Sequence, residues 1–331
     1  MKHKVLVTGS TGFIGSHIAD ELLGRDYEVR CTIRKTSNLQ WLKDKPIELI
    51  ETSFNNLDQI KKAVDGVDYI IHNAGAIAAK SEEDFMNSNF TATKNLLDIA
   101  IASVTNLKKF IFISSQTVAG PAKSYDKPVK EEDGFNPLSP YARSKKAAEE
   151  YVLSKKESYP VLILRPSAVY GPRDPAILEI FQMVNKGLAT LIGFKPHYVN
   201  LIHSTDLVRA IIDAMESDKT TGKIYFLASE EAYSWDEIMN ILKKHLNKKF
   251  LLKLKVPHFL VLGIGVLSGF FGKFSKKPPI FYYEKAVEFI QEYWICSVEK
   301  AQKDFNFKTN IPLENGLKET IDWYKANKWL K

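Results

Sequence analysis

The sequence predicts an α/β protein with a Rossmann-type, doubly wound parallel sheet and a smaller C-terminal α+β part. Two observations carry this prediction. Short β-branched runs alternate with amphipathic helical stretches in the first half of the chain, which is typical of βαβ units. A glycine-rich turn also joins the first predicted strand to the first predicted helix. The alternation ends after Arg165, where prolines and glycines gather.

The predicted strands and helices follow from the two-residue period of apolar side chains in strands and the period of about 3.6 residues in helices. Strands are expected at 4–8, 28–33, 47–51, 69–72, 109–114 and 161–164, and helices at 15–24, 57–64, 87–103 and 141–158. The break after Arg165 predicts a dinucleotide-binding domain at 1–170 and a mainly substrate-binding domain at 171–331, with 200–228 returning to the first domain. Within that return, 200–215 and 223–228 are the segments that could rejoin the main sheet.

Composition indicates a folded protein of a reducing compartment. The 331 residues are 45% hydrophobic, which is enough for a large core. Cys31 and Cys296 are far apart and lack metal-ligand spacing, so neither a disulfide framework nor a metal site is expected. The first residues run directly into a strand pattern without a secretory signal, and we expect a cytoplasmic protein.

The charge of +7 does not by itself define a partner. The lysines are dispersed, without the aromatic-interleaved stripe of a nucleic-acid reader, so no nucleic-acid partner is expected. The apolar stretch 259–271 is too short to span a bilayer, so no membrane span is expected. A buried helix or a lid over a lipophilic substrate is favoured there, and weak peripheral membrane association stays open because three lysines follow at 273, 276 and 277.

The glycine-rich turn predicts a dinucleotide site. Gly9 permits the tight turn, Gly12 allows close approach of a pyrophosphate, and Gly15 allows the helix to pack on the strand. The helix N-terminus offers unpaired N–H groups to the anion. The expected cofactor contacts in this turn also include Thr11, Phe13 and Ile14.

Four further motifs accompany the glycine turn, at 70–75, 89–93, 112–115 and 165–172. Together with the glycine spacing they resemble the extended short-chain dehydrogenase/reductase superfamily, the NAD-dependent epimerase/dehydratase family. Among its members the motifs are most similar to dihydroflavonol reductases and 3β-hydroxysteroid dehydrogenases. The resemblance covers nearly the whole chain and implies a catalytic serine in the strand that ends at 114–115. It also implies cofactor-binding residues at Asn73, Ala74, Gly75, Asn89, Pro166, Ala168 and Val169.

Three Tyr-x-x-x-Lys pairs occur, and their context separates them. Tyr141 and Lys145 follow a Ser-Pro pair that is typical of a helix start, and they lie one turn apart on one helix face. Tyr151 lies too far along the same helix to reach the carboxyl edge of the sheet. Tyr324 belongs to the C-terminal segment, so both are interpreted as packing residues.

The predicted chemistry is hydride transfer with proton exchange at a carbonyl. A phenol has a pKa near 10, and the Lys145 ammonium is expected to lower the pKa of Tyr141. Tyr141 would then protonate the carbonyl oxygen while Ser115 orients it. Ser115 is preferred over Ser114 because it stands three residues before Val118, as in the family motif. The resemblance also gives Lys145 the nicotinamide ribose hydroxyls.

The end of the second strand predicts the cofactor preference. NAD enzymes place an acid there, and this chain has Arg34 and Lys35 instead. The resemblance to NADP-using reductases implies that Arg34 meets the 2′-phosphate, so NADP(H) is preferred while NAD(H) stays open. Ser53, followed by Phe54, stands where the family often has an aspartate, which weakens the expected fit at the adenine side.

Three functions remain open: a reductase or dehydrogenase of a small, uncharged or lipophilic substrate, a sugar-nucleotide epimerase with tightly bound NAD, and a non-catalytic dinucleotide sensor. The first is preferred, because Ala168 and Val199 stand where sugar-nucleotide enzymes carry phosphate-binding groups. Arg173 could still bind an anion. The family's habit of pairing through the helices that begin near Asn87 and Tyr141 implies a homodimer.

Overall fold

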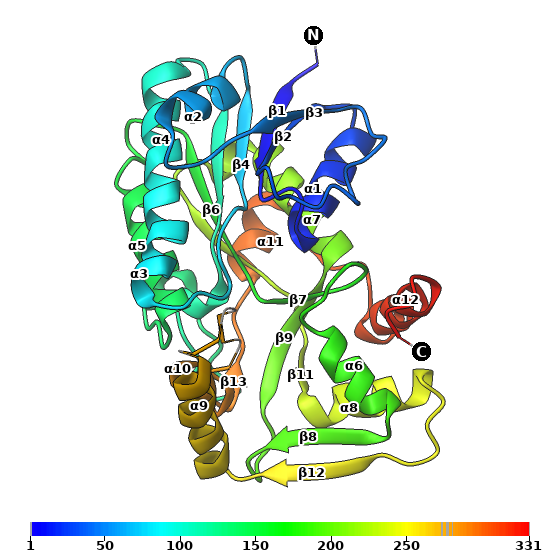
Figure 1. Ribbon diagram of the computed structural model, residues 1–331. Coiled ribbons are helices and arrows are strands. Elements are labelled where there is room, and N and C mark those ends of the chain that lie inside the picture. The colour runs from blue at the N-terminus through cyan, green and yellow to red at the C-terminus, as the bar shows by residue number, and fades with distance from the viewer. Residues whose placement is uncertain (1, 273, 276–277, 280, 331) are drawn as a thin grey trace.

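A seven-stranded parallel sheet forms the centre of the protein (Figure 1). The computed structural model describes residues 2–272, 274–275, 278–279 and 281–330. The strand order is β10-β6-β5-β4-β1-β2-β3, and every pairing is parallel, so the predicted doubly wound fold is confirmed. The strands are β1 (Lys4–Thr8), β2 (Glu28–Ile33), β3 (Ile47–Glu51), β4 (Tyr69–His72), β5 (Lys109–Ile113), β6 (Val161–Pro166) and β10 (Ile224–Leu227).

Alternating side chains of the strands build two cores, one on each face of the sheet. Val5 and Val7 point to one face and Leu6 to the other, because successive side chains of a strand alternate. The first face is covered by α1 (Phe13–Gly24), α7 (Ser204–Glu216) and α11 (Glu299–Phe305), and the second by α2 (Leu57–Val64), α4 (Ala92–Ser103) and α5 (Pro140–Leu153). Both faces of the sheet are therefore covered by helices and shielded from water, as is usual for a parallel sheet.

Strand order also locates the ligand crevice. The chain moves outward from β1 through β2 to β3, then crosses back to β4 beside β1. Such a reversal leaves a crevice at the carboxyl ends of the two central strands, where open α/β sheets bind ligands. The turn after β1 and the segment after β4 meet at this point.

Two predicted helix boundaries were wrong. The helix expected at 141–158 ends at Leu153, where the Ser154 hydroxyl donates to the Tyr151 carbonyl and competes with continuation of the helix. The segment expected as one helix at 87–103 begins with a π-helical turn, Met86–Thr91, before α4. Such π turns widen a helix locally and often occur at functional sites.

Only part of the segment 200–228 rejoins the main sheet. β10 pairs with β6, and α7 packs in the core beside α1. β9 (Tyr198–His203) instead joins a second sheet with β7 (Ala168–Tyr170), β11 (Ala232–Ser234) and β13 (Tyr293–Trp294), so the return of residues 200–203 to the main sheet was wrong. The Asn200 side chain fixes this second sheet by bonding Ser229, Glu231 and Cys296 backbone groups. A division into independently folding domains stays a prediction.

The remaining elements form a third core at the far end of the molecule. α6 (Leu178–Asn185), α8 (Trp235–His245) and α12 (Leu313–Ala326) pack together over β8 (Leu188–Ile192), which pairs with β12 (Leu252–Val256). α9 (His258–Gly272) and α10 (Tyr283–Phe289) lie beside each other below α3 (Glu82–Phe85) and α5 in the view of Figure 1. Within the described residues, every helix is too short or too polar to cross a membrane.

Candidate active site

The glycine turn after β1 is built for close contact. Gly9 has φ +68°, and a Cβ on it would lie 2.9 Å from the Ala74 backbone. A Cβ on Gly15 would lie 2.2 Å from the Gly9 carbonyl oxygen, so α1 can approach β1 only with glycine there. Gly12 caps α1 and is exposed, which leaves the helix N-terminus accessible to an anion. Thr11, Phe13 and Ile14 are half-buried in the same turn.

The segment after β2 presents two cations to solvent. Arg34 and Lys35 are exposed, and neither forms an ion pair with any residue that the structure describes. Ser53, after β3, is exposed as well, and its backbone N–H donates to Gln59 Oε1. Phe54 packs edge-on against His72, with ring centroids 5.7 Å apart. The free guanidinium of Arg34 is available to a phosphate.

Asn73, Ala74 and Gly75 follow β4 and form the wall opposite the glycine turn. Gly75 is exposed, and a Cβ on it would lie 2.9 Å from Asn89 Oδ1. His72, at the end of β4, hydrogen-bonds the hydroxyls of Thr8 and Thr93, and burial lowers the pKa of its imidazole to about 3. A neutral, doubly hydrogen-bonded histidine holds the strand end in place.

Asn89 lies in the π-helical turn and joins two walls of the site. Its amide donates to the Ala76 carbonyl at 3.1 Å and to Ser144 Oγ at 2.9 Å, and its carbonyl oxygen accepts the Ala76 N–H at 2.7 Å. Both amide hydrogens are therefore used within the protein. The bonds of Asn89 position the segment after β4 against α5, and its contact with a cofactor stays a prediction.

The start of α5 carries the predicted tyrosine and lysine. Ser139 caps the helix by accepting the Ala142 N–H at 3.3 Å, and Pro140 occupies its first turn. Tyr141 is half-buried, and its ring meets that of Phe85 edge-on at 6.2 Å between centroids. Lys145, one turn later, is 4% exposed and points toward β5.

The two adjacent serines after β5 have different environments. Ser115 lies close enough to the Tyr141 phenol to lower its pKa, and its Oγ accepts the Thr117 hydroxyl at 2.9 Å. Ser114 is buried and donates to Glu149 at 2.7 Å on the other side of the strand. Ser115 is therefore the serine that the structure brings to Tyr141.

Burial dominates the electrostatics of the tyrosine and lysine. It raises the pKa of the Tyr141 phenol to about 12, with a further rise from Glu288 and an opposing effect of nearby Ser115. It lowers the pKa of the Lys145 ammonium to about 7, against the raising effect of Glu149. Lys145 Nζ donates to the Ile113 carbonyl at 2.6 Å and lies 4.1 Å above the Phe112 ring centroid. The expected lowering of the Tyr141 pKa by Lys145 was wrong, because burial raises this pKa and Lys145 is not among the groups that shift it.

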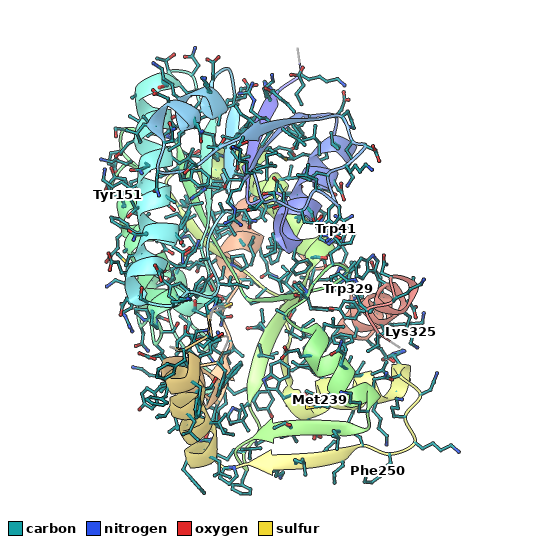
Figure 2. All side chains as sticks on the ribbon, in the orientation of Figure 1. Trp41, Tyr151, Met239, Phe250, Lys325 and Trp329 are labelled. Carbon is teal, nitrogen blue, oxygen red and sulfur yellow. The ribbon has the colours of Figure 1, made fainter. Side chains whose placement is uncertain are left out.

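The turn after β6 brings three predicted residues near the crevice. Pro166 ends β6 and is buried, Ala168 is exposed, and Val169 is half-buried. Val199 is 5% exposed within the third core, so neither it nor Ala168 offers a group for a phosphate. Arg173 is already engaged: it pairs with Asp20 at 2.8 Å, and its guanidinium lies over Trp41, whose side chain Figure 2 labels.

A cavity of about 660 Å³ opens beside the start of α5. Its walls are Phe85 and Pro140 on one side and Gly265, Phe270 and Tyr282 on the other, with Lys80 as the one cation among the described lining residues. Two carboxylates, those of Glu82 and Glu284, face the same space. Tyr141 itself does not line this cavity, but two lining residues adjoin it: Pro140 precedes it in the chain, and the Phe85 ring meets its ring.

Three residues near the site were missed by sequence reasoning. Thr117 fixes the Ser115 hydroxyl, Glu149 joins Ser114 to the Arg165 guanidinium, and Glu288 of α10 accepts the Ser139 hydroxyl at the start of α5. The last contact joins positions 149 residues apart, and no motif marks it. In the sequence, Thr117 could have been found by its position two residues after Ser115. No comparable signal points to Glu149 or Glu288.

The glycine turn, the crevice and the Tyr-Lys-Ser group are the features of a nicotinamide-dinucleotide-dependent enzyme. Residues 5–228 match the NAD dependent epimerase/dehydratase family, and the chain belongs to it. Among curated relatives, a ceramide reductase of Caulobacter vibrioides is 26% identical over 98% of this chain and 96% of its own. A UDP-glucose 4-epimerase of Vibrio cholerae is 28% identical over 81% and 83%, and a sterol-4-alpha-carboxylate 3-dehydrogenase of Candida albicans is 24% identical over 96% and 97%.

Solved structures show the same fold. A UDP-glucuronic acid 4-epimerase from Bacillus cereus, in complex with NAD, matches with a TM-score of 0.79 at 24% identity, over 98% of this chain and 99% of that one. The chain is thus an NAD(P)-dependent enzyme of the extended short-chain dehydrogenase/reductase type, as predicted, and the sensor hypothesis loses its support. Among the residues that the structure describes, no group of three or more His, Cys, Asp or Glu could hold a metal ion.

Proposed function

We propose that this protein interconverts a carbonyl and an alcohol on an uncharged, lipophilic substrate with NADP(H), using Tyr141, Lys145 and Ser115. The observation that carries the proposal is the largely apolar cavity beside Tyr141, walled by Phe85 and Phe270. The names of two relatives, a ceramide reductase and a sterol dehydrogenase, support a lipid-like substrate. Relatives at 24–26% identity do not define the substrate of this chain, so the apolar cavity is the main support for a lipophilic one.

The cofactor-binding residues fit a dinucleotide. Gly12 leaves the α1 N-terminus open to a pyrophosphate, and Arg34 is a free guanidinium where a 2′-phosphate would lie. The bound nicotinamide would supply or accept the hydride. Lys145, which donates to the Ile113 carbonyl in this structure, would hold the ribose hydroxyls.

The protein's own groups handle the proton. With a pKa near 12, Tyr141 stays protonated at neutral pH and can donate to a carbonyl oxygen as that oxygen gains charge. Ser115, held by Thr117, donates a second hydrogen bond to the same oxygen. Lys145, with a pKa near 7, exists in both protonation states at neutral pH and can return a proton toward Tyr141.

A sugar-nucleotide epimerase with bound NAD is the second candidate, and the 28% identity to a UDP-glucose 4-epimerase favours it. The site argues against it, because Ala168 and Val199 carry no phosphate-binding group and Arg173 is paired with Asp20. We also propose that the protein forms a homodimer and is located in the cytoplasm. Buried, free Cys31 and Cys296 support a reducing compartment.

The test is to identify the nucleotide and then the reaction. The purified protein is denatured, the released nucleotide is identified, and NADPH oxidation is followed with a panel of long-chain ketones. We expect exchangeable NADP(H) and turnover of apolar ketones. Stoichiometric, non-exchanging NAD together with conversion of a UDP-sugar would replace this proposal by the epimerase.

Arg34→Ala is expected to weaken NADPH binding by roughly 10- to 150-fold, because a charge-assisted hydrogen bond contributes about 1.5–3 kcal/mol net. NADH lacks the 2′-phosphate, so its dissociation constant should change less than about threefold. Arg34→Lys serves as the matched variant, retaining the charge without the planar fork, and should lie between wild type and Arg34→Ala. Fluorescence titration of both cofactors measures this, and equal losses for NADH and NADPH would contradict the assignment.

A further inference from the structure

Helix α9 exposes large apolar side chains to solvent and buries small residues, the reverse of the usual arrangement at a protein surface. Two of its glycines face inward: a Cβ on Gly265 would lie 2.8 Å from Ala286 Cβ, and one on Gly272 would lie 2.7 Å from Pro279 Cβ, whereas Gly263 is exposed. The small residues let α9 lie directly against the segment that carries α10. The large apolar side chains of the helix are consequently left on the outer face.

Large apolar side chains are exposed on that outer face and elsewhere at the same end of the molecule. Along α9 the exposed side chains recur at helical spacing: Phe259 (70% exposed), Ile264 (53%), Leu267 (59%), Phe270 (55%) and Phe271 (66%). The connected strand β12 adds Leu252 and Leu254, and Phe250 projects at the same end of the molecule (Figure 2). Exposed apolar patches of this kind mark interaction sites.

The sequence on either side of the same helix is rich in lysine. Two of the lysines that the structure describes are paired, Lys244 with Glu314 and Lys253 with Asp236. Residues 238–283 contain nine Lys and no Arg, Asp or Glu, which gives this segment a formal charge of +9. The whole chain carries +7, so the rest of the protein is net acidic at −2. Among the described residues, Lys249 and Lys255 are exposed and form no ion pair with another described residue.

We propose that this end of the protein docks on the surface of an anionic lipid bilayer. The outer face of α9 would enter the boundary between headgroups and acyl chains, and the lysines would contact lipid phosphates. At 15 residues α9 is too short to span a bilayer, so it lies in the interface. A second copy of this chain is a poorer occupant, because it would bring two +9 segments together.

Docking here would connect the bilayer to the active site. Phe270, on the exposed face of α9, also lines the cavity beside Tyr141, and the Ser139–Glu288 hydrogen bond ties α10 to the start of α5. A membrane-resident lipid could therefore enter the cavity beside the start of α5 along α9. This consequence rests on the proposed function, whereas the docking itself does not.

Vesicle co-sedimentation, without cofactor or substrate, tests the docking. Wild type is expected to partition onto phosphatidylcholine vesicles containing roughly one-third phosphatidylglycerol, and to partition less as salt rises from about 0.1 M to about 1 M. Ile264→Ser/Leu267→Ser/Phe271→Ser should lower the partition coefficient at least about 100-fold, because three large apolar side chains no longer enter the lipid. The matched control, Leu49→Ser/Leu57→Ser/Ile101→Ser, alters exposed apolar residues of the main sheet and its helices and should stay within about twofold of wild type.

Charge is tested separately. Lys249→Gln/Lys255→Gln should lower partition onto the anionic vesicles by roughly 25-fold, about fivefold per lysine, and leave partition onto pure phosphatidylcholine unchanged. Absence of wild-type partition onto anionic vesicles would overturn the proposal. So would a wild-type dimer that the α9 triple variant converts to monomer, with no vesicle binding by either. Because no turnover is measured, failure here is distinct from failure of the proposed reductase activity.

Discussion

Tyr141→Phe is expected to lower kcat by about 10²- to 10⁴-fold, the contribution typical of a general acid. The substitution removes the proton donor and keeps the ring, which meets Phe85 edge-on. The cofactor dissociation constant should therefore stay within a few-fold of wild type. Steady-state kinetics with NADPH and a long-chain ketone, together with a fluorescence titration of NADPH, measure the two quantities independently.

Tyr151→Phe is the matched control, because Tyr151 lies on the same helix and also precedes a lysine by four positions. Its hydroxyl bonds Asp98 and its ring packs on Phe90, on the outer side of the helical layer (Figure 2). It should keep near-wild-type kcat. Full activity in Tyr141→Phe combined with a large loss in Tyr151→Phe would refute the assignment.

Glu149→Leu is expected to lower the free energy of unfolding by about 3–5 kcal/mol, because it leaves a buried guanidinium unpaired. Arg165 and Glu149 are 1% and 0% exposed as side chains, and Arg165 Nε donates to Glu149 at 3.0 Å. Arg165 also lies between the rings of Phe135 and Phe226, and its Nη1 has no partner among the described residues. Urea unfolding followed by circular dichroism measures the loss.

The double variant Glu149→Leu/Arg165→Met should recover most of that stability, since it removes both buried charges. Asp322→Asn, which breaks the exposed pair with Lys318, should cost less than about 1 kcal/mol. A Glu149→Leu protein as stable as wild type would show that the buried pair is not needed. Because Glu149 also bonds Ser114 beside Ser115, the single variant should lower activity as well.

Local patterns in the sequence were sufficient to predict most of the sheet and to propose the site residues. Four of the six predicted strands, β1 to β4, have the predicted boundaries, because β-branched alternation and flanking turns are local signals. The glycine turn and the start of α5 were equally local, since each needs only a few consecutive residues of defined backbone conformation. Gly9, Ser115 and Tyr141 could therefore be proposed without knowledge of the fold, and their roles stay predictions.

The tertiary structure decided the features that depend on burial and on contacts between distant segments. It placed Lys145 at the Ile113 carbonyl and shifted the pKa values of Lys145 and Tyr141, because desolvation depends on how the neighbouring elements pack. It joined Ser139 to Glu288 and placed β9 outside the main sheet. It also turned Gly265 and Gly272 of α9 inward, while large apolar side chains of that helix face out. A sequence pattern gives the period of an apolar face, and only packing determines what that face meets.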